Sequence, residues 1–555
     1  MNNSVSNNTR FSQDTTFDTM NARIFELEKR VEELEKLNEA LTEKYSAEVK
    51  LNGELNQEID DLNEMLEVVY AEKDALIKKV EDLKQENLEL RSKTRKNSKN
   101  SSKPPSSDGY RKPKPKSRRK RSGKKPGGQK GHPGSHMSIP HDPDETVEHY
   151  PEKCQNCPHF CSCLEGGNFK CQEKRYVVDV VVETKVTEHQ RFDAKDCPQE
   201  SGIKLKAQFP KDIKAYVQYG NSITVLAGLL STYGAMSYER MHVFLSELIG
   251  VSLSQGTLWA MVKRCAEKVG PVMEEVKDLL IENDVDHFDE TGVRVNGRLY
   301  WVHSSSSKDF TYQTIHEKRG QEGIDDNGVL PHFNGVAVHD CWSSYWKYPN
   351  ATHAICCAHL LRELEGIQEI APEHKWPSEF ISLLLRMKTQ KEQDIGYGKE
   401  QASSYHLHKF DREYERVINL AESECPPPPK PTEKKRGRPK KGLERSLLER
   451  LTNHKDEVCR FFTNFAVPFD NNLSEQDVRS SKAKTKIIGC FRTEEGAKEY
   501  FRLSSFISTA RKQGVNAFKA VTAAIENKAR IAIEKIQNFL FKRKKNQSPG
   551  EIASA

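Results

Sequence analysis

An aspartate follows an apolar run in the stretch VAVHDCWSSY, residues 336–345. Residues 336–339 have the composition and period of a strand, and Asp340 comes directly after them. An aspartate at such a place suits a helix cap or a turn. It also suits a metal ligand at the end of a strand, because hard divalent cations prefer carboxylate oxygens. The choice between these roles depends on which other residues lie nearby.

Two further acids are candidates to act with Asp340. Asp289 stands within HFDETGVRV, and Glu475 follows the run 470–472, Asp-Asn-Asn, which is typical of the capped start of a helix. On that helix Glu475 would face inward, whereas Asp477 would point elsewhere. A site for two divalent ions needs a third acidic group, which Glu475 would supply. Taken singly, each acid is equally consistent with a cap, a turn or a solvated face.

The surrounding elements predict a mixed sheet. Antiparallel strands are expected at 285–290, 298–304 and 310–315, with an Asn-Gly turn in VNGR. A helical piece follows, then the strand that ends at Asp340, then a short strand and a helix in HAICCAHLLRELEGIQEI. Three antiparallel strands followed by crossovers to parallel ones is the order of a ribonuclease H-like fold. In that topology the first and fourth strands are neighbours, so Asp289 and Asp340 would converge.

A heptad pattern runs from Ile24 to Leu90 without a shift in register. One apolar position holds Leu27, Leu34, Leu41, Glu48, Leu55, Leu62, Val69, Leu76, Leu83 and Leu90. The partner position includes Asn38, Asn52 and Asn87, and buried asparagine pairs favour parallel dimers. We therefore expect a parallel coiled coil; the alternative, a single solvated helix, has no use for a leucine stripe.

The segment after the heptads is strongly basic. Between Arg91 and Lys130 there are 17 lysines or arginines and one acid, among many Gly, Pro and Ser residues that exclude a packed core. The tract includes the run Arg118, Arg119, Lys120 and Arg121. A flexible basic tract binds nucleic acid by releasing counterions. The alternatives are a solvated linker and a targeting signal.

A second basic segment, KRGRPKKG, resembles an AT-hook. Arg436 and Arg438 flank Gly437, whose missing side chain lets the backbone enter a narrow minor groove, and Pro439 keeps the segment extended. We expect this segment to bind DNA, and a charged loop is the alternative.

Cysteines gather between residues 150 and 200. Cys154 and Cys157 have the spacing of a zinc knuckle. The reducing environment of the cytosol keeps cysteines available as thiolate ligands for zinc. The further candidate zinc ligands are Cys161, Cys163, Cys171 and Cys197. Glu200 occupies the place where a second CxxC would have its last cysteine. The stretch RYVVDVVVETKVTEHQ between them predicts a strand. Buried free thiols are the alternative to a zinc-finger-like module.

The stretch SYERMHVFLSELIGVSLSQGTLWAMVKRC predicts two amphipathic helices joined at Gly250, with Ser252 or Ser254 capping a second helix that starts near Gln255. This pair resembles a helix-turn-helix, and an ordinary helical hairpin is equally consistent. The whole chain is thus predicted to be a multidomain α/β protein. Its segments are 1–22, disordered; 23–91, coiled coil; 92–140, basic flexible linker; 141–212, zinc-finger-like; 213–282, helical; 283–500, ribonuclease H-like catalytic domain with a helical insertion at about 376–455; and 501–555, a C-terminal helical segment and basic tail.

The totals agree with several domains, because 555 residues are too many for one core. The net charge of +6 conceals the strongly basic blocks. No apolar run approaches the ~20 residues that a membrane span needs, and the N-terminus lacks the apolar core of a signal peptide. We expect a cytoplasmic protein whose 13 cysteines are reduced or bound to metal.

The chain is similar to transposases of the insertion-sequence-66 family, a DDE-type group. The strings that carry the resemblance are KNSKNSSKPPSSD, GGQKGHPG, HFDETGVRVNGRLYWV, VHDCWSSY, CAHLLREL, PFDNNLSEQDVR and ARKQGVNAF, in the family's order. The resemblance implies a leucine zipper, a zinc-finger region, a ribonuclease H-like catalytic domain and a small C-terminal domain. It places the catalytic triad at Asp289, Asp340 and Glu475. At Glu200 the zinc region departs from the family's pattern.

The resemblance implies Mg²⁺-dependent cleavage at the ends of a mobile element and strand transfer into target DNA. Two Mg²⁺ ions, or Mn²⁺, would be held by the three acids, and a structural Zn²⁺ is the second expected metal. Expected partners are element-end and target DNA, a second copy through the coiled coil, and helper proteins encoded by the same element, in the bacterial cytoplasm at the nucleoid. Two other classes remain: a non-catalytic DNA-binding or regulatory relative, and a ribonuclease H-like nuclease in DNA repair.

Overall fold

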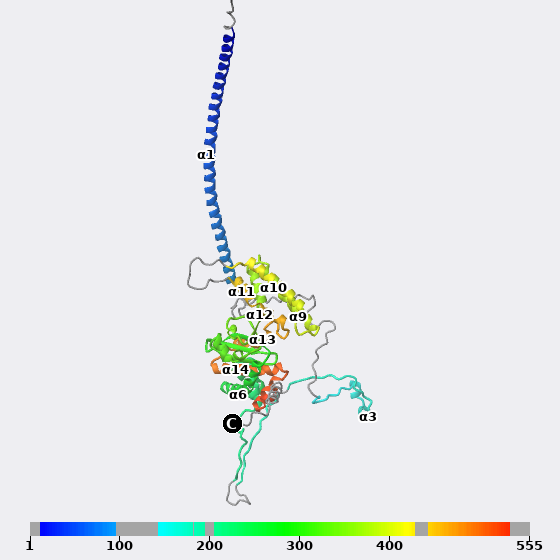
Figure 1. The fold of residues 1–555 in the computed structure, drawn as a ribbon. Helices are drawn as coiled ribbons and strands as arrows, with labels where there is room; N and C mark the ends of the chain where they lie inside the picture. Colours follow the sequence, from blue (N-terminus) through cyan, green and yellow to red (C-terminus); the bar gives the residue numbers. More distant parts are fainter. Residues whose placement is uncertain (1–10, 96–141, 181, 195–204, 428–441, 533–555) are drawn as a thin grey trace, which may run out of the picture. The chain divides into compact units, whose positions relative to one another are not determined.

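Helix α1, Phe11–Arg95, is one continuous α-helix (Figure 1). The structure is a computed structural model that describes residues 11–95, 142–180, 182–194, 205–427 and 442–532. The chain divides into two compact units, residues 1–94 and 95–555. Helix α1 covers the predicted coiled coil and begins before its expected start at residue 23.

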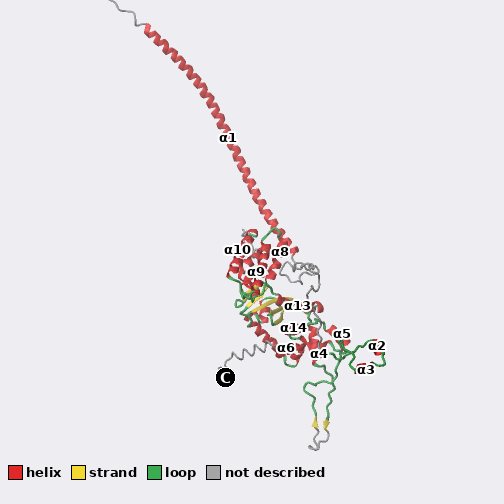
Figure 2. Ribbon diagram, turned by 90° about the vertical axis from the view of Figure 1, so that its right-hand side faces the viewer, coloured by secondary structure: helices red, strands yellow, loops and turns green. Residues whose placement is uncertain are grey.

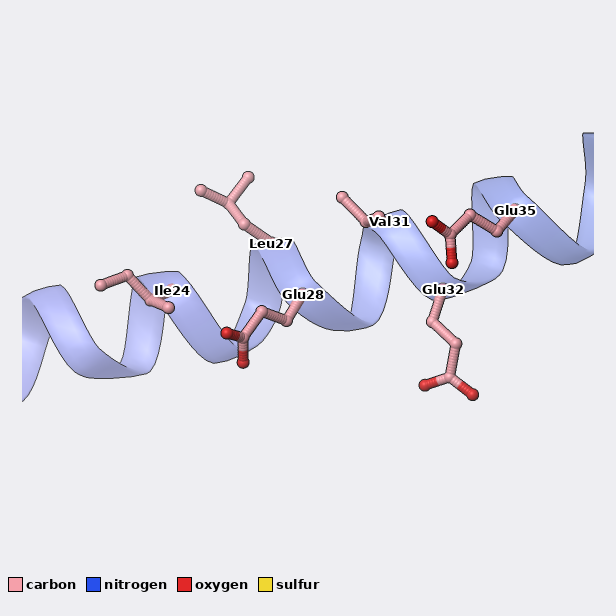
Figure 3. Close-up of a pocket in the computed structure, with 6 residues that line it drawn as sticks. All are labelled: Ile24, Leu27, Glu28, Val31, Glu32 and Glu35. Atoms are coloured by element: carbon pink, nitrogen blue, oxygen red, sulfur yellow. The ribbon is translucent and has the colours of Figure 1, made fainter.

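The heptad stripe of α1 is unburied within the single chain. Leu34 and Leu62 are 54% and 55% exposed, although leucine favours burial. In Figure 3, Leu27 and Val31 project from one side of the helix and Glu32 from the other. The apolar side chains of the stripe are therefore exposed within the single chain.

A mixed sheet of five strands forms the centre of the second unit (Figure 2). Its strands are β3 Val285–Val295, β4 Arg298–Ser306, β5 Thr311–His316, β6 Val336–His339 and β7 Thr352–Ile355. They lie in the order β5-β4-β3-β6-β7. The pairs β3–β4 and β4–β5 are antiparallel, and the pairs β3–β6 and β6–β7 are parallel. The predicted strand order and directions are confirmed, and β3 and β6 are neighbours.

The hairpin between β3 and β4 turns at Asn296 and Gly297, as the Asn-Gly pair predicted. Both residues have positive φ, 47° and 75°, which a two-residue turn of this hand requires. The turn is fixed from outside as well, because the Asn296 N–H donates to the Phe491 carbonyl at 2.8 Å. The segment that follows the Glu475 helix is thus attached to the tip of this hairpin.

One face of the sheet packs on helices that precede it in the sequence and on helices that follow it. These are α4 Asn221–Thr232, α5 Tyr238–Ile249, α6 Gln255–Ile281, α14 Glu494–Lys512 and α15 Ala517–Ile525. Phe288 and Ala337 of the sheet share a core with Val262, Leu503 and Val521 from these helices. The helices of the predicted segments 213–282 and 501–555 therefore pack with the sheet in one core. The boundary predicted at residue 500 falls inside α14.

The helix pair α5–α6 forms as the sequence predicted. Helix α5 ends at Gly250, with φ of 73°, and Ser254 caps α6 by accepting a hydrogen bond from the Thr257 N–H at 3.0 Å. Leu258 is already fully buried in the first turn of α6, whereas Trp259 is 41% exposed. The beginning of α6 thus contributes to the core, which is consistent with both predicted alternatives, a helix-turn-helix and an ordinary helical hairpin.

Helices α8 Cys357–Ile370, α9 Trp376–Gly396, α10 Ser404–Glu424, α11 Leu443–Asn453 and α12 Lys455–Thr463 follow the sheet. They form a second core that reaches the sheet at Val338, Ala354 and Ile355. Because Ala337 belongs to the first core and its neighbour Val338 to the second, the two helical groups cover opposite faces of β6. The predicted helical insertion is thus a packed layer between β7 and α13, Asn472–Ile488.

The shorter elements complete the fold. They are α2 Glu152–Gln155, α3 Phe160–Glu165, β1 Asp193–Ala194, β2 Leu205–Lys206, α7 Gln321–Asn327, and the 3₁₀ turns Leu330–His332, Tyr345–Lys347 and Ala529–Ala532. The strand predicted over 175–190 is wrong for the residues described there, none of which is in a strand. Val177 and Val180 are 88% and 87% exposed, and an extended segment without a neighbouring strand has no ladder to join. Among the helices of the described ranges, none is both long and apolar enough to cross a bilayer.

Candidate active site

Two of the predicted acids lie at the same level of adjacent parallel strands. In the pairing of β3 with β6, His287 stands opposite Val338. Asp289 and Asp340 each come two residues later: Asp289 lies inside β3, and Asp340 follows the last residue of β6. The Oδ1 atom of Asp340 accepts a hydrogen bond from the Trp342 N–H at 3.1 Å, which orients this carboxylate at the start of the following loop. The sheet topology thus brings both aspartates to one edge.

The third acid is held against the same strand by a buried asparagine. Asn471, which is fully buried, immediately precedes α13. Its Oδ1 lies 2.7 Å from the His287 Nδ1, and its Nδ2 donates to the Phe288 carbonyl at 2.8 Å. Glu475 lies in the first turn of α13. The asparagine therefore fixes the start of the Glu475 helix one or two residues away from Asp289.

The run 470–472 opens a helix as predicted, and Asn471 is the N-cap residue of α13. The side chain makes no capping hydrogen bond. The amide has one acceptor and one donor group, and both are engaged by β3. Asp470 bonds locally instead, because its Oδ1 accepts from the Asn472 N–H at 3.2 Å. A tertiary contact has replaced the local one that composition favours.

Asp477 points away from the aspartates, as helical geometry predicted. Its carboxylate accepts hydrogen bonds from Ser306 Oγ at 2.7 Å, Thr311 Oγ1 at 2.9 Å and Lys512 Nζ at 2.8 Å. These partners belong to β4, β5 and α14. Helix α13 is thus tied to the sheet on two sides, by Asn471 and by Asp477, and Glu475 lies between the two ties.

The three acids share one electrostatic environment. The pKa of Asp289 is raised well above its ordinary value, first by loss of water and then by the charges of Glu290, Asp340 and Glu475. One oxygen of Glu475, Oε1, is buried and has no hydrogen-bond partner. Within the described residues, the three acids do not form a group whose oxygens all lie within 4.8 Å of one another, so an ion shared by all three would draw them closer together. Like charges near one another in a site with little water are unfavourable unless a cation offsets them. The carboxylates therefore fit a divalent ion, which takes oxygen ligands.

A fourth carboxylate, which the sequence did not single out, lies beside them. Glu290 is only 9% exposed; it accepts a hydrogen bond from Arg319 Nε at 2.9 Å and another from the Tyr345 hydroxyl. Burial and the charge of Asp340 raise the pKa of Glu290 to about 7, although Arg319 opposes the shift. The Arg319 guanidinium lies over the ring of Trp342, 4.2 Å from its centroid. The only feature of the sequence that pointed to Glu290 was its position next to Asp289. Neighbouring side chains of a strand point to opposite faces, so a strand with one buried face would leave Glu290 in solvent.

Basic side chains surround the acids on the helix side. Burial lowers the pKa of Lys482, and the charges of Asp289 and Glu475 oppose that shift, so Lys482 lies near both. Arg362 and Arg479 approach Glu475 to 3.6 and 3.8 Å, beyond hydrogen-bond length. Cations arranged around a carboxylate cluster, without pairing tightly with it, are suited to contact the phosphates of a nucleic acid.

A comparison with known protein families gives two matches. Residues 217–499 match the model of the Transposase IS66 family. The chain belongs to the IS66 transposase family. The matched region contains the whole five-stranded sheet and the helix α13. Residues 14–138 match a second model, described as a family of unknown function (DUF6444). A search of curated proteins finds no match.

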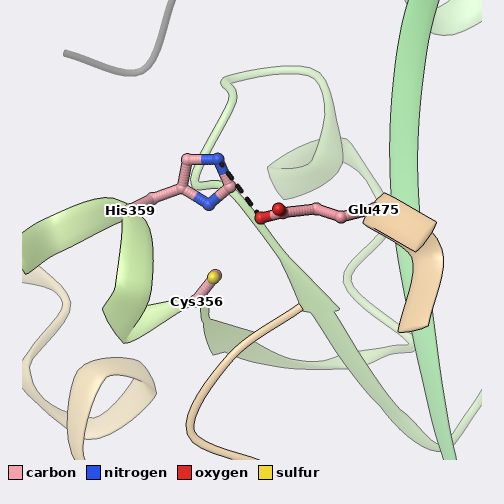
Figure 4. Close-up of side chains that lie close together, drawn as sticks. All are labelled: Cys356, His359 and Glu475. Carbon is pink, nitrogen blue, oxygen red and sulfur yellow. Dashed lines mark ion pairs between the residues drawn. The ribbon is translucent and has the colours of Figure 1, made fainter. Parts of the chain in front are cut away.

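A cysteine and a histidine of the transposase face Glu475 from α8 (Figure 4). His359 Nε2 lies 3.8 Å from Glu475 Oε1, and Cys356 lies at the N-cap of α8. The other histidine near the site, His339, is fully buried, and its Nε2 lies 3.0 Å from His353 Nδ1. His339 is therefore a packing residue, whereas His359 belongs to the site.

The remaining predicted residues lie elsewhere. Cys154 and Cys163 are partly buried, and Cys157, Cys161 and Cys171 are exposed. Within the described residues, these sulfurs do not form a group of three potential ligands within 4.8 Å of one another. The predicted residues outside the described part of the chain are Cys197, Arg118, Arg119, Lys120, Arg121, Arg436, Gly437, Arg438 and Pro439.

Proposed function

We propose that this IS66 family member is a DNA transposase of the DDE type, with Asp289, Asp340 and Glu475 as its catalytic acids. The observation that carries the proposal is that Asp289 of β3 lies at the level of Asp340, directly after β6, and that the charges of Asp340 and of Glu475 in α13 raise the pKa of Asp289. The strand order and directions also support a ribonuclease H-like fold, in which this edge is the expected place for catalytic acids.

The three acids would hold two Mg²⁺ ions, or Mn²⁺. The raised pKa of Asp289 supports this assignment, because a cation would offset the repulsion among the carboxylates. When bound, such a pair of ions supplies an activated water and stabilises the leaving 3′ oxygen of a phosphodiester. The freed 3′ hydroxyl would then attack target DNA at the same site, with no covalent link to the protein.

The chain's own groups would position the DNA. Arg362, Arg479 and Lys482 lie close enough to the acids to hold the phosphates that flank the cleaved bond. Glu290, hydrogen-bonded to Arg319 and Tyr345, would keep β3 rigid next to Asp289. In-line attack requires such fixed contacts, because small errors in orientation cost large factors in rate.

Other segments would bring the DNA ends together. The exposed heptad stripe of α1 would pair with a second copy as a parallel coiled coil, with one subunit for each end of the element. The basic tract at 92–140 and the AT-hook-like segment 436–439 would bind DNA, and the cysteines of 154–197 would hold a structural Zn²⁺. Helper proteins of the same element would assist at the bacterial nucleoid.

The proposal is tested with Asp340→Asn. Purified full-length protein is incubated with element-end DNA, a target plasmid and Mg²⁺, and cleavage and joining are measured on gels. We expect the change to abolish both products, by at least about 10³-fold, because it removes a charged metal ligand without changing side-chain size. Binding to the end DNA should persist, since the basic segments are unaltered.

Asp326→Asn is the matched control, because Asp326 is exposed on α7, away from the three acids. It should leave cleavage and joining unchanged. Joining by Asp340→Asn at the wild-type rate would remove the proposed mechanism. Loss of DNA binding together with activity would show that the change had damaged the fold rather than the metal site.

A further inference from the structure

Three side chains with different donor atoms meet beside the catalytic acids. Cys356 Sγ, a ring nitrogen of His359 and a carboxylate oxygen of Glu475 all lie within 4.8 Å of one another. Figure 4 shows Cys356 and His359 approaching from the start of α8, and Glu475 approaching from α13 on the other side. The three residues come from two helices whose starts are held together, so their proximity is built into the fold.

Two polar atoms of this cluster have no hydrogen-bond partner. His359 Nδ1 and Glu475 Oε1 are buried and have no hydrogen-bond partner. Cys356 is fully buried, and its sulfur accepts a hydrogen bond from the Asn471 N–H at 3.2 Å. Leaving buried polar atoms unpaired costs about 1–3 kcal/mol each, so a group that would satisfy them is expected.

We propose that Cys356, His359 and Glu475 form a binding site for a thiophilic divalent cation, with Zn²⁺ as the best fit. Thiolate and imidazole ligands favour Zn²⁺, whereas Mg²⁺ demands oxygen ligands. Zinc bonds of about 2.0–2.3 Å in a tetrahedron place the ligand atoms roughly 3.5 Å apart, so side-chain movements of about 1 Å would close the site. Three protein ligands would leave the fourth position for water.

Binding has a defined proton balance. The Cys356 thiol loses its proton to solvent as the metal–sulfur bond forms, and His359 binds as the neutral imidazole. Burial raises the pKa of the Cys356 thiol to about 12 and lowers the pKa of His359. The Asn471 N–H, which donates to the Cys356 sulfur, would help the metal to stabilise the thiolate.

The site would regulate the activity proposed above, on which this consequence rests. Glu475 cannot serve a Zn²⁺ ion on the α8 side and a Mg²⁺ ion on the Asp289 side with the same oxygens. Zinc would thus withdraw the third acid and inhibit DNA cleavage, and Mg²⁺ would compete only weakly because it cannot use the sulfur. The enzyme would lose activity where free zinc rises.

Cobalt(II) provides the direct test, because a cobalt–thiolate bond gives a charge-transfer absorption in the near ultraviolet. Full-length protein is titrated with Co²⁺ in three forms: wild type, Cys356→Ser and Cys357→Ser. Cys357 is the matched control, since it is equally buried but its sulfur bonds to the Ile355 and Val458 carbonyls. The cysteines of 154–197 contribute equally to all three, so difference spectra isolate this site.

We expect the charge-transfer band in the difference between wild type and Cys356→Ser, and no band in the difference between wild type and Cys357→Ser. His359→Asn should weaken cobalt binding without removing the sulfur, which guards against a folding artefact of the serine variant. A difference spectrum without the band, or an equal band for both serine variants, would overturn the site.

Inhibition is measured in the same set of variants. For each variant we determine the Zn²⁺ concentration that halves its own Mg²⁺-dependent cleavage. This concentration should rise at least ~100-fold in Cys356→Ser, because losing even a residue that only hydrogen-bonds to a metal ligand lowers metal affinity about 10- to 100-fold. An unchanged midpoint would overturn the regulatory role. If the wild type cleaves no DNA at all, the proposed function fails, and the cobalt spectra still decide the metal site.

Discussion

Asn471 is the residue whose removal most directly tests how the site is assembled. Its side chain joins α13 to β3 through His287 and Phe288, and no other described side chain makes both bonds. Asn471→Ala deletes the amide but keeps the backbone N–H. The acids of β3 and α13 would then lose the tie between them, while the tie at Asp477 would remain.

The magnitude follows from the groups left unpaired. His287 is 3% exposed, and the Phe288 carbonyl belongs to a residue that is 4% exposed, so water does not readily replace the amide. Each buried group left without a partner costs about 1–3 kcal/mol, which gives about 2–6 kcal/mol for the two. Burial lowers the pKa of His287, so the ring stays neutral and no charge is exposed or lost.

The assay is urea unfolding of the full chain followed by tryptophan fluorescence, paired with Mg²⁺ titration of DNA cleavage. We expect a lower unfolding midpoint for Asn471→Ala and a higher Mg²⁺ requirement, because Asp289 and Glu475 are no longer held in register. Asn472→Ala is the control: Asn472 is exposed at the first position of α13, where alanine costs less than about 0.5 kcal/mol.

Equal unfolding midpoints for Asn471→Ala and Asn472→Ala would refute the reasoning, because the bridge would then contribute nothing to stability. A stable Asn471→Ala protein with an unchanged Mg²⁺ requirement would be equally damaging. It would mean that Asp477 alone positions Glu475.

Three further changes test other parts of the structure. Asp477→Asn should destabilise the second unit by about 3–5 kcal/mol in urea unfolding, because it breaks a mostly buried ion pair with Lys512. A loss of stability under about 1 kcal/mol would contradict a stabilising role for this ion pair. The apparent Mg²⁺ affinity should rise as pH increases through about 7, since the pKa of Glu290 is raised to about 7 and only the deprotonated carboxylate attracts the cation. Glu290→Gln should flatten that rise, and an unchanged pH profile would exclude Glu290. Leu62→Asp should convert the wild-type dimer into a monomer, as measured by light scattering, since Leu62 lies in the exposed heptad stripe. A wild-type protein that is already monomeric would exclude the coiled-coil dimer.

The sheet was predictable because its signals are local and mutually consistent. The Asn-Gly turn fixes the hairpin at 296–297, and the parallel pairing of β3 with β6 follows from the order of the strands. Once those two strands are neighbours, Asp289 and Asp340 must emerge at the same edge. The start of α6 at Gln255 was equally readable, because a serine cap and a preceding glycine mark it.

The partners of Asn471 and Glu290 were not predictable in the same way. An asparagine before a helix has two good uses, and the local one is favoured by statistics, whereas the tertiary one depends on His287, 184 residues away. Glu290 follows Asp289 in a strand, so alternation alone would expose it; Arg319 and Tyr345, from later loops, make its burial tolerable. Both are cases where the partner, rather than the residue, decides the role.

The long insertion between the second and third acids does not separate them, because it closes on itself. The chain leaves the sheet at the start of α8 and returns just before α13, and these two points are hydrogen-bonded: the Cys357 N–H donates to the Phe469 carbonyl at 3.0 Å, and the Asn471 N–H to the Cys356 sulfur at 3.2 Å. Loop closure grows costly only slowly with length, and α9–α12 offset it by forming their own core. The two hydrogen bonds that close the insertion also hold the start of the helix that carries Glu475. A change in the insertion's packing would therefore be transmitted to the third acid through Cys356 and Asn471.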